Sequence, residues 1–324
     1  MSEGLVGLNG GRSYHMARRR SIPDTHSPFA ALPVEFVTLA AGRRIAVHVA
    51  GPLSHRRLPV VCLAGYHRNM TDFTELAQQF RRMGGGGWPL VLMDLAGRGR
   101  SDDRARGSDY NSVADARDVA SVLAALGIGR AVILGQGHGG QVAMLLAADH
   151  PLLVGGTLLI DAGPMTDSRG IVRLRNNIAH LHSLRGPAVT AGFRRVLGGD
   201  YPGLPEERLD RLSQRTHYLD RRARARPLFD NRLIEVLGKF SFDDVLVAQW
   251  PLFEALRCAP LMMMRTQLTD QLRRETYEEM VRRRPDAIAL TMEGQGSPAL
   301  LERADEAEAI ADFVQQASAG ARAA

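Results

Sequence analysis

The chain has 324 residues, of which 45% are apolar, and its formal net charge is +6. This length accommodates one large α/β domain with an insertion or two domains, and the apolar content excludes a wholly disordered chain. Lys239 is the only lysine, so nearly all of the positive charge is arginine. The arginines are scattered and are not interleaved with aromatic residues, so we expect no nucleic-acid partner.

Cysteine content and hydropathy bound the compartment. Cys62 and Cys258 lie in or beside apolar segments, and we expect both to be buried free thiols, as in a reducing compartment. The sequence has no uninterrupted run of about 18 apolar residues and no apolar stretch behind its N-terminal arginines. These features predict a cytoplasmic protein with no membrane partner.

The first part of the chain predicts a tail followed by strands. Residues 1–33 are polar and without periodicity, so we expect a flexible tail. Glu35–Leu39 and Arg44–Val49 alternate around Ala41-Gly42, which predicts a β-hairpin. Short runs that are almost wholly apolar predict strands buried on both faces, as in a parallel sheet. These runs are Pro59–Leu63, Leu90–Met93, Ala131–Leu134, Thr157–Ile160 and Leu261–Met264, and Ala287–Thr291 is a further predicted strand.

Helical patterns alternate with these strands. They cover Asp72–Arg82, Val113–Leu126, His138–Ala148, Glu275–Arg282 and Asp305–Gln316, and Asn111 or Ser112 is expected to cap the second. The alternation predicts a mostly parallel, doubly wound α/β sheet. Strand-like runs are missing between Met165 and Trp250, which predicts an inserted helical cap. The expected organisation is therefore a core over residues 34–164 and 251–317, a cap over 165–250, and a frayed end over 318–324.

The segment from Ala131 to Met144 is the most informative for function. It contains an apolar strand, the glycine-rich turn GQGHGG and a helix, which is the setting of the nucleophile elbow G-x-S-x-G. Gly137 stands where that motif has serine. The same turn also fits G-x-G-x-x-G through Gly135, Gly137 and Gly140, with Asp161 ending the next apolar run. By itself this segment therefore leaves an NAD-linked oxidoreductase open.

Four other segments carry a resemblance to a known family. Leu63–Asn69 is similar to an oxyanion loop H-G-x-x-R-N, and Asp94–Ser101 to a turn D-x-R-G-x-G-x-S. Asp161–Pro164 and Trp250–Leu256 are similar to the pieces that enter and leave a cap. Over roughly residues 34–316 the chain resembles the α/β-hydrolase superfamily, in its lactonase-, epoxide-hydrolase- and C–C-hydrolase-like branch. This motif order favours a hydrolase, because a Rossmann fingerprint usually follows the first strand.

The resemblance implies a catalytic triad in the order nucleophile, acid and histidine. Gly137 matches the nucleophile position, and Asp270 matches the acid, although Asp270 could instead cap the following helix. Ser297 matches the histidine position, and the last histidine of the chain is His217. Because a serine hydroxyl does not titrate near neutral pH, the triad is expected to be degenerate. The sequence thus predicts a non-catalytic binding or regulatory protein.

Other polar groups are expected near the same turn. The resemblance implies that the backbone N–H groups of Tyr66 and His138 line an oxyanion site. His67 and His138, with Asp161, are candidates for a rebuilt acid–base site in a hydrolase or lyase, or else are structural. We expect no cofactor and no metal, since His180 and His182 have no evident third ligand. The expected partner is a small apolar molecule between core and cap, with a homo-oligomer or protein partner left open.

Overall fold

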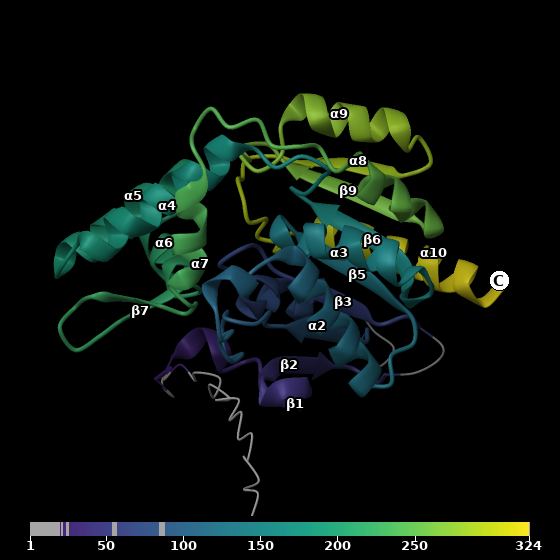
Figure 1. Cartoon of the computed structure of the whole chain (residues 1–324), viewed down its shortest axis with the longest axis horizontal. Coiled ribbons are helices and arrows are strands. Elements are labelled where there is room, and N and C mark those ends of the chain that lie inside the picture. The colour runs from purple at the N-terminus through teal and green to yellow at the C-terminus, as the bar shows by residue number, and fades with distance from the viewer. Residues whose placement is uncertain (1–19, 21, 24–25, 54–56, 84–87, 324) are drawn as a thin grey trace, which may run out of the picture.

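The computed structural model describes residues 20, 22–23, 26–53, 57–83 and 88–323 (Figure 1). An eight-stranded sheet in the order β1-β2-β4-β3-β5-β6-β9-β10 crosses this part of the molecule. The strands are β1 (Glu35–Thr38), β2 (Arg44–Ala50), β3 (Val60–Leu63), β4 (Leu90–Met93), β5 (Ala131–Gln136), β6 (Val154–Ile160), β9 (Leu261–Thr266) and β10 (Ile288–Met292). Strands β1, β2 and β4 pair antiparallel, and all other neighbours pair parallel. The predicted hairpin and the mostly parallel sheet are confirmed.

The central strands are apolar along their whole length because both faces of the sheet are covered. In β3, Val61 and Leu63 face one apolar cluster, whereas Val60 and Cys62 face the other. This is the two-residue alternation of a strand, with a hydrophobic residue required on each face. Parallel pairing also brings the carboxyl ends of β3, β5 and β6 to one edge, where Leu63 lies opposite Gly135.

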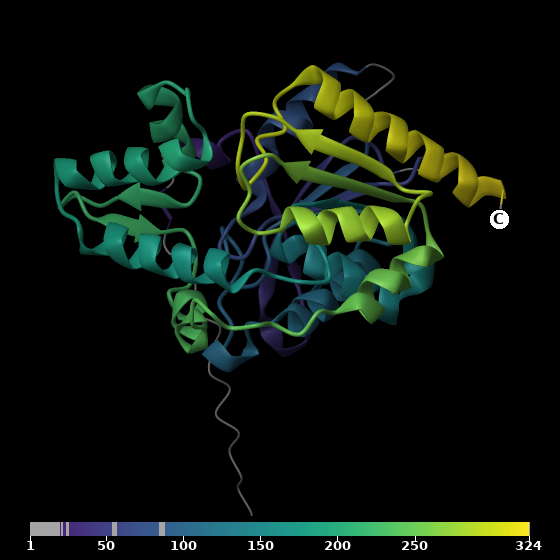
Figure 2. The same cartoon turned by 90° about the horizontal axis from the view of Figure 1, so that it is seen from above.

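Helices form a layer on each face of the sheet (Figures 1 and 2). Side chains of α2, α3, α8 and α9 pack in one cluster, and those of α1 and α10 pack in the other. These helices are α1 (Thr74–Arg82), α2 (Ser112–Ala125), α3 (His138–Asp149), α8 (Trp250–Glu254), α9 (Arg274–Arg283) and α10 (Ala304–Ala323). The predicted cap at Asn111 is confirmed, because its side chain accepts a hydrogen bond from the N–H of Ala114 at 2.9 Å.

Most of the residues between β6 and α8 lie beside the sheet rather than on it. In Figures 1 and 2 the helices of this inserted segment (residues 165–250) form a separate group to the left of the sheet. The helices are α4 (Ser168–Ser183), α5 (Pro187–Asp200), α6 (Glu206–Ser213) and α7 (Arg232–Val236). Unexpectedly, the segment also contains two short antiparallel strands, β7 (His217–Leu219) and β8 (Ala225–Pro227).

The structure corrects three expectations. The last helix continues to Ala323, so the described residues from 318 onward are helical rather than frayed. Part of the expected N-terminal tail packs on the molecule, since a 3₁₀ turn spans Ser27–Phe29 and Leu32 is 1% exposed. Cys62 is buried, as expected, but Cys258 is exposed. Within the described residues, the helices are too short or too polar to cross a bilayer.

Candidate functional site

A cavity of about 420 Å³ lies between the carboxyl edge of the sheet and the inserted segment. Its apolar wall comes mainly from the inserted segment. These side chains are Met165, Ile171, Leu174, Ile178, Leu181, Phe193, Val196, Leu197, Val236, Leu237, Phe240 and Leu246. Its polar floor comes from the ends of the strands and the loops that follow them, where all the predicted site residues lie.

Gly137 forms the sharp turn between β5 and α3. Its φ of 50° and ψ of −111° belong to a region that side chains rarely adopt, and its N–H donates to Ile160 O at 2.9 Å. A Cβ built on Gly137 would have no other atom within 4 Å. By contrast, a Cβ on Gly139 would lie 2.1 Å from Leu63 O, and one on Gly140 2.3 Å from the Cβ of Ala162. The close approach of helix and sheet therefore requires the later glycines, whereas position 137 has room for a side chain.

Ser297 lines the cavity and contacts a buried carboxylate. Its hydroxyl donates to Asp161 Oδ2 and lies 2.8 Å from the hydroxyl of Thr269. Thr266 donates to both oxygens of Asp161, from its N–H at 2.8 Å and its hydroxyl at 2.7 Å. Burial raises the pKa of Asp161 to about 6, although the hydrogen bonds from Ser297 and Thr266 oppose this rise. Asp161 also has a φ of 49°, which is strained for a residue with a side chain.

Asp270, the residue matched to the triad acid, is not a hydrogen-bond partner of Ser297. Its carboxylate accepts from Arg173 Nε at 2.5 Å, and Arg173 also donates to Asp200 at 2.9 Å. Asp270 does not cap α9 either, since Arg273 is the residue before that helix. The carboxylate that touches Ser297 is thus Asp161, at the end of β6, and Asp270 instead joins an ion pair with the inserted segment.

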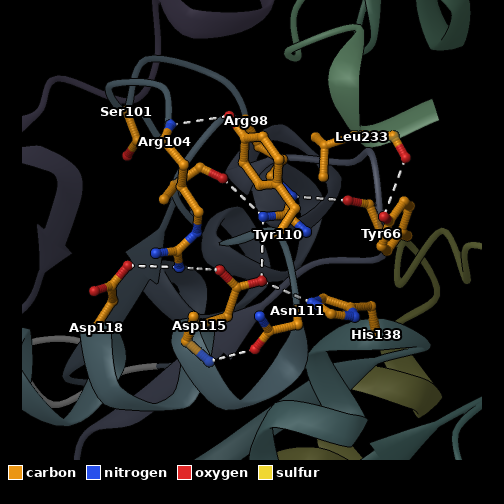
Figure 3. A network of polar contacts seen from close by, with 12 residues as sticks. Tyr66, Arg98, Ser101, Arg104, Tyr110, Asn111, Asp115, Asp118, His138 and Leu233 are labelled. Carbon is orange, nitrogen blue, oxygen red and sulfur yellow. Dashed lines mark hydrogen bonds and ion pairs between the residues drawn. The ribbon is translucent and has the colours of Figure 1, made fainter. Parts of the chain in front are cut away.

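His138, directly after the turn, belongs to a buried network of charges (Figure 3). Its Nε2 lies 2.8 Å from Asp115 Oδ2, and Asp115 on α2 is 0% exposed. Arg98 and Arg104 also bind the Asp115 carboxylate, at 3.1 and 2.6 Å. Burial alone would raise the pKa of Asp115, but Arg98, His138 and Arg104 hold it well below its usual range. Asp115 is therefore ionised at neutral pH.

This network determines which nitrogen of the His138 imidazole carries the hydrogen. An ionised carboxylate only accepts hydrogen bonds, so Nε2 of His138 must donate to Asp115. Burial lowers the pKa of His138, and the opposing effect of Asp115 does not cancel it. At neutral pH the ring is therefore neutral, and its Nδ1 is a hydrogen-bond acceptor. The ring also lies edge-on to Tyr66, with centroids 5.3 Å apart.

His67 lies with other rings at the junction of core and inserted segment. It packs edge-on against Phe229 at 5.4 Å, and His217 packs on the same ring at 5.4 Å. Burial, with Arg68 and Arg98, lowers the pKa of His67 to about 3, so the ring is neutral. His67 and His138 thus contact different partners, and neither hydrogen-bonds Asp161. The rebuilt site expected from these three residues is not assembled as one hydrogen-bonded unit.

The two predicted oxyanion groups keep free backbone donors. Among the residues that the structure describes, the N–H groups of Tyr66 and His138 find no hydrogen-bond acceptor, and both residues line the cavity. The Tyr66 hydroxyl points elsewhere and donates to Leu233 O at 3.1 Å. The site therefore retains backbone donors beside a turn without a side chain.

Comparison with known proteins agrees with this geometry. A sequence model of the alpha/beta hydrolase fold matches residues 59–258. The chain belongs to the α/β-hydrolase family. The match confirms the assignment that the motif order favoured over a dinucleotide-binding fold.

Several α/β-hydrolase relatives and solved structures match this chain, some over most of its length and others over part of it. A 3-hydroxybutyrate-oligomer hydrolase from Cupriavidus necator is 26% identical over 77% of this chain and 85% of that protein. A 2-hydroxy-6-oxononadienedioate/2-hydroxy-6-oxononatrienedioate hydrolase from Burkholderia vietnamiensis is 30% identical over 41% of this chain and 43% of that protein. The crystal structure of an alpha/beta hydrolase from Novosphingobium aromaticivorans superposes with a TM-score of 0.76 and 27% identity, covering 88% of this chain and 99% of that one.

Sequence reasoning missed two parts of this α/β-hydrolase site. Asp115 carried a usable signal, because it precedes the buried Val119 and Val122 at helical spacing and so lies on the inner face of α2. The contact between Asp161 and Ser297 carried no local signal, because 136 residues separate the two in the chain.

Proposed function

We propose that this α/β-hydrolase-family protein has lost serine-nucleophile catalysis and binds a small, largely apolar molecule in the cavity. Gly137 carries the proposal, because the turn that would present a nucleophile bears no side chain at all. The inserted segment acts as the cap over this molecule and supplies the apolar wall.

The position matched to the catalytic histidine supports the same function. Ser297 is held between Thr269 and Asp161, and a hydroxyl in that place does not exchange a proton near neutral pH. A triad without nucleophile and base retains only binding and the oxyanion donors. The triad is therefore degenerate at both positions that transfer the proton.

Relatives support a ligand of modest size. Two of them are named as a 3-hydroxybutyrate-oligomer hydrolase and a 2-hydroxy-6-oxononadienedioate/2-hydroxy-6-oxononatrienedioate hydrolase. We propose that the cavity of this chain accepts a molecule of similar size without cleaving it. A cytoplasmic location is part of the proposal and is supported by the unpaired thiols of Cys62 and Cys258.

One observation favours a second function. Asp161 is a strained, buried carboxyl beside the cavity, and its pKa of about 6 is close to that of a general base working near neutral pH. In this second function Asp161, which lines the cavity, acts as the general base toward a water molecule, and no covalent intermediate forms.

Turnover of p-nitrophenyl acetate and p-nitrophenyl butyrate by the wild type, Asp161→Asn and Asp270→Asn separates the two functions. The proposed function predicts hydrolysis at the buffer rate for all three proteins. Wild-type turnover that disappears in Asp161→Asn and persists in Asp270→Asn would instead establish the second function. Turnover that survives both changes would contradict both.

A further inference from the structure

We propose that the cavity selects a neutral, hydroxyl-bearing apolar molecule, because side chains at the Gly137 turn present hydrogen-bond acceptors. This inference rests on the proposed function, since it names the ligand class for the same cavity. The acceptors come from two elements, namely the first residue of α3 and the loop after β10.

The hydroxyl of Ser297 is oriented by a chain of hydrogen bonds. The N–H of Gln271 donates to Thr269 Oγ1 at 3.0 Å, and the hydroxyls of Thr269 and Ser297 are 2.8 Å apart. Ser297 has one hydrogen and gives it to Asp161, so the hydroxyl of Thr269 must donate to Ser297. Each group in this series therefore donates toward the Asp161 carboxylate, and Ser297 can offer only a lone pair to the cavity.

The donor-to-acceptor direction of these hydrogen bonds is maintained as long as Asp161 is ionised. With a pKa of about 6, it is mostly a carboxylate at pH 7.5 and only accepts hydrogen bonds. The hydroxyl of Thr266 also donates to it at 2.7 Å, so two hydroxyls converge on Oδ2. An amide at position 161 would instead donate from its nitrogen and release the hydrogen of Ser297 toward the cavity.

His138 adds an acceptor at the same turn. Asp115 takes the hydrogen on His138 Nε2, so the neutral ring offers Nδ1 as an acceptor. A ligand hydroxyl at this turn can donate to this nitrogen or to the Ser297 oxygen, and both residues line the cavity.

The same groups reject charged ligands. One oxygen of a carboxylate could accept from the backbone N–H groups of Tyr66 and His138, but the other would face the acceptors of Ser297 and His138, which costs the desolvation of each unpaired atom. An ammonium group would lie at the N-terminus of α3, where free N–H groups and the helix dipole disfavour a cation. A hydroxyl both accepts from the backbone N–H of His138 and donates to a side chain. The apolar wall then holds the rest of the molecule.

Three probes with the same eight-carbon chain test the ligand class: octan-1-ol, octanoate and octylammonium. Isothermal titration calorimetry at pH 7.5 should show that octan-1-ol binds the wild type on the order of tenfold more tightly than either ion. Ser297→Ala should remove most of this preference. Ser183→Ala is the matched control, because the Ser183 hydroxyl is exposed on α4 and bonds His180 O, away from the cavity.

Asp161→Asn should weaken the preference for octan-1-ol over octanoate. Because it turns the Ser297 hydroxyl into a donor, it should bring octanoate affinity up toward that of octan-1-ol, with circular dichroism confirming the fold. The ligand class is overturned if either ion binds the wild type as tightly as the alcohol. It is equally overturned if no probe binds, or if Asp161→Asn leaves the preference unchanged. The proposed loss of serine catalysis is tested separately, because ester turnover by the wild type would contradict it whatever the binding results.

Discussion

At Gly137 the backbone adopts a conformation that any other residue reaches only with strain. A Cβ at this position would meet no other atom within 4 Å, so we expect the cost of replacing the glycine by serine to be mainly conformational, about 1–3 kcal/mol. Guanidinium unfolding of Gly137→Ser measures it. Gly139→Ser is the matched control, and it should be far more destabilising because its Cβ would lie 2.1 Å from Leu63 O. Equal losses of unfolding free energy in the two variants would show that backbone strain does not determine the cost at position 137.

The contribution of Asp161 to the free energy of unfolding should depend on pH in a defined way. Its pKa is about 3.8 when unfolded and about 6 when folded, so the folded state binds the proton more tightly. The stability from this proton is fully present below pH 3.8 and is lost as the pH rises through 6. Asp161→Asn keeps the shape, tolerates the positive φ and removes the titration. The variant should therefore exceed the wild type by up to about 3 kcal/mol above pH 7 and by little below pH 4.

Unfolding free energies at pH 4, 5, 6 and 7.5 check this slope. Asp305→Asn is a useful comparison, because the exposed ion pair of Asp305 with Arg303 at 2.8 Å lowers the pKa of Asp305. Its contribution should have the opposite sign, present at neutral pH and lost on acidification. A difference between Asp161→Asn and wild type that does not change with pH would contradict the raised pKa.

At the scale of elements, Asp115 joins α2 to the turn that starts α3. Its carboxylate neutralises Arg98, whose side chain is 0% exposed, so Asp115→Asn would leave a buried charge unpaired. We expect a loss of about 3–5 kcal/mol of unfolding free energy in urea. Asp118→Asn should cost less, because the Asp118 side chain is 12% exposed and the guanidinium it shares, Arg104, keeps Asp115. Similar losses in both variants would mean that the burial of Arg98 does not set the cost.

Elements were predictable from sequence where one short pattern determined them. The apolar runs gave the parallel strands because burial on both faces leaves no polar position, and the Asn111 cap is likewise a local signal. The β7 and β8 strands were missed because each has three residues, too few for a period to show. The helical extension to Ala323 was missed because the end of the chain lacks a clear apolar stripe.

The site was only partly predictable for a related reason. Gly137, Ser297 and the Tyr66 loop follow strands in a fixed order, so a family pattern locates them. Which carboxylate meets Ser297 depends on the loops after β6 and β10, and the structure brings Asp161 there instead of Asp270. No spacing in the sequence encodes that contact, since it arises from how the strand ends converge.

At the level of the whole molecule, the proposed loss of serine catalysis depends on two positions, Gly137 and Ser297. Gly137→Ser with Ser297→His should restore slow ester hydrolysis, whereas either single change should do nearly nothing, because nucleophile and base act as a unit. The restored activity should be lost on adding Asp161→Asn and retained on adding Asp270→Asn, measured with p-nitrophenyl acetate. Dependence on Asp270 instead would show that the acid expected from the family pattern still works.

If serine catalysis is lost as proposed, the wild-type chain carries no activated serine. Incubation with excess fluorophosphonate at pH 7.5, followed by intact-protein mass spectrometry, tests it most directly, with an active serine esterase labelled in parallel. We expect an unchanged mass for the wild type under conditions that fully label the esterase. A stoichiometric adduct, mapped by peptide sequencing to any serine of the chain, would contradict it.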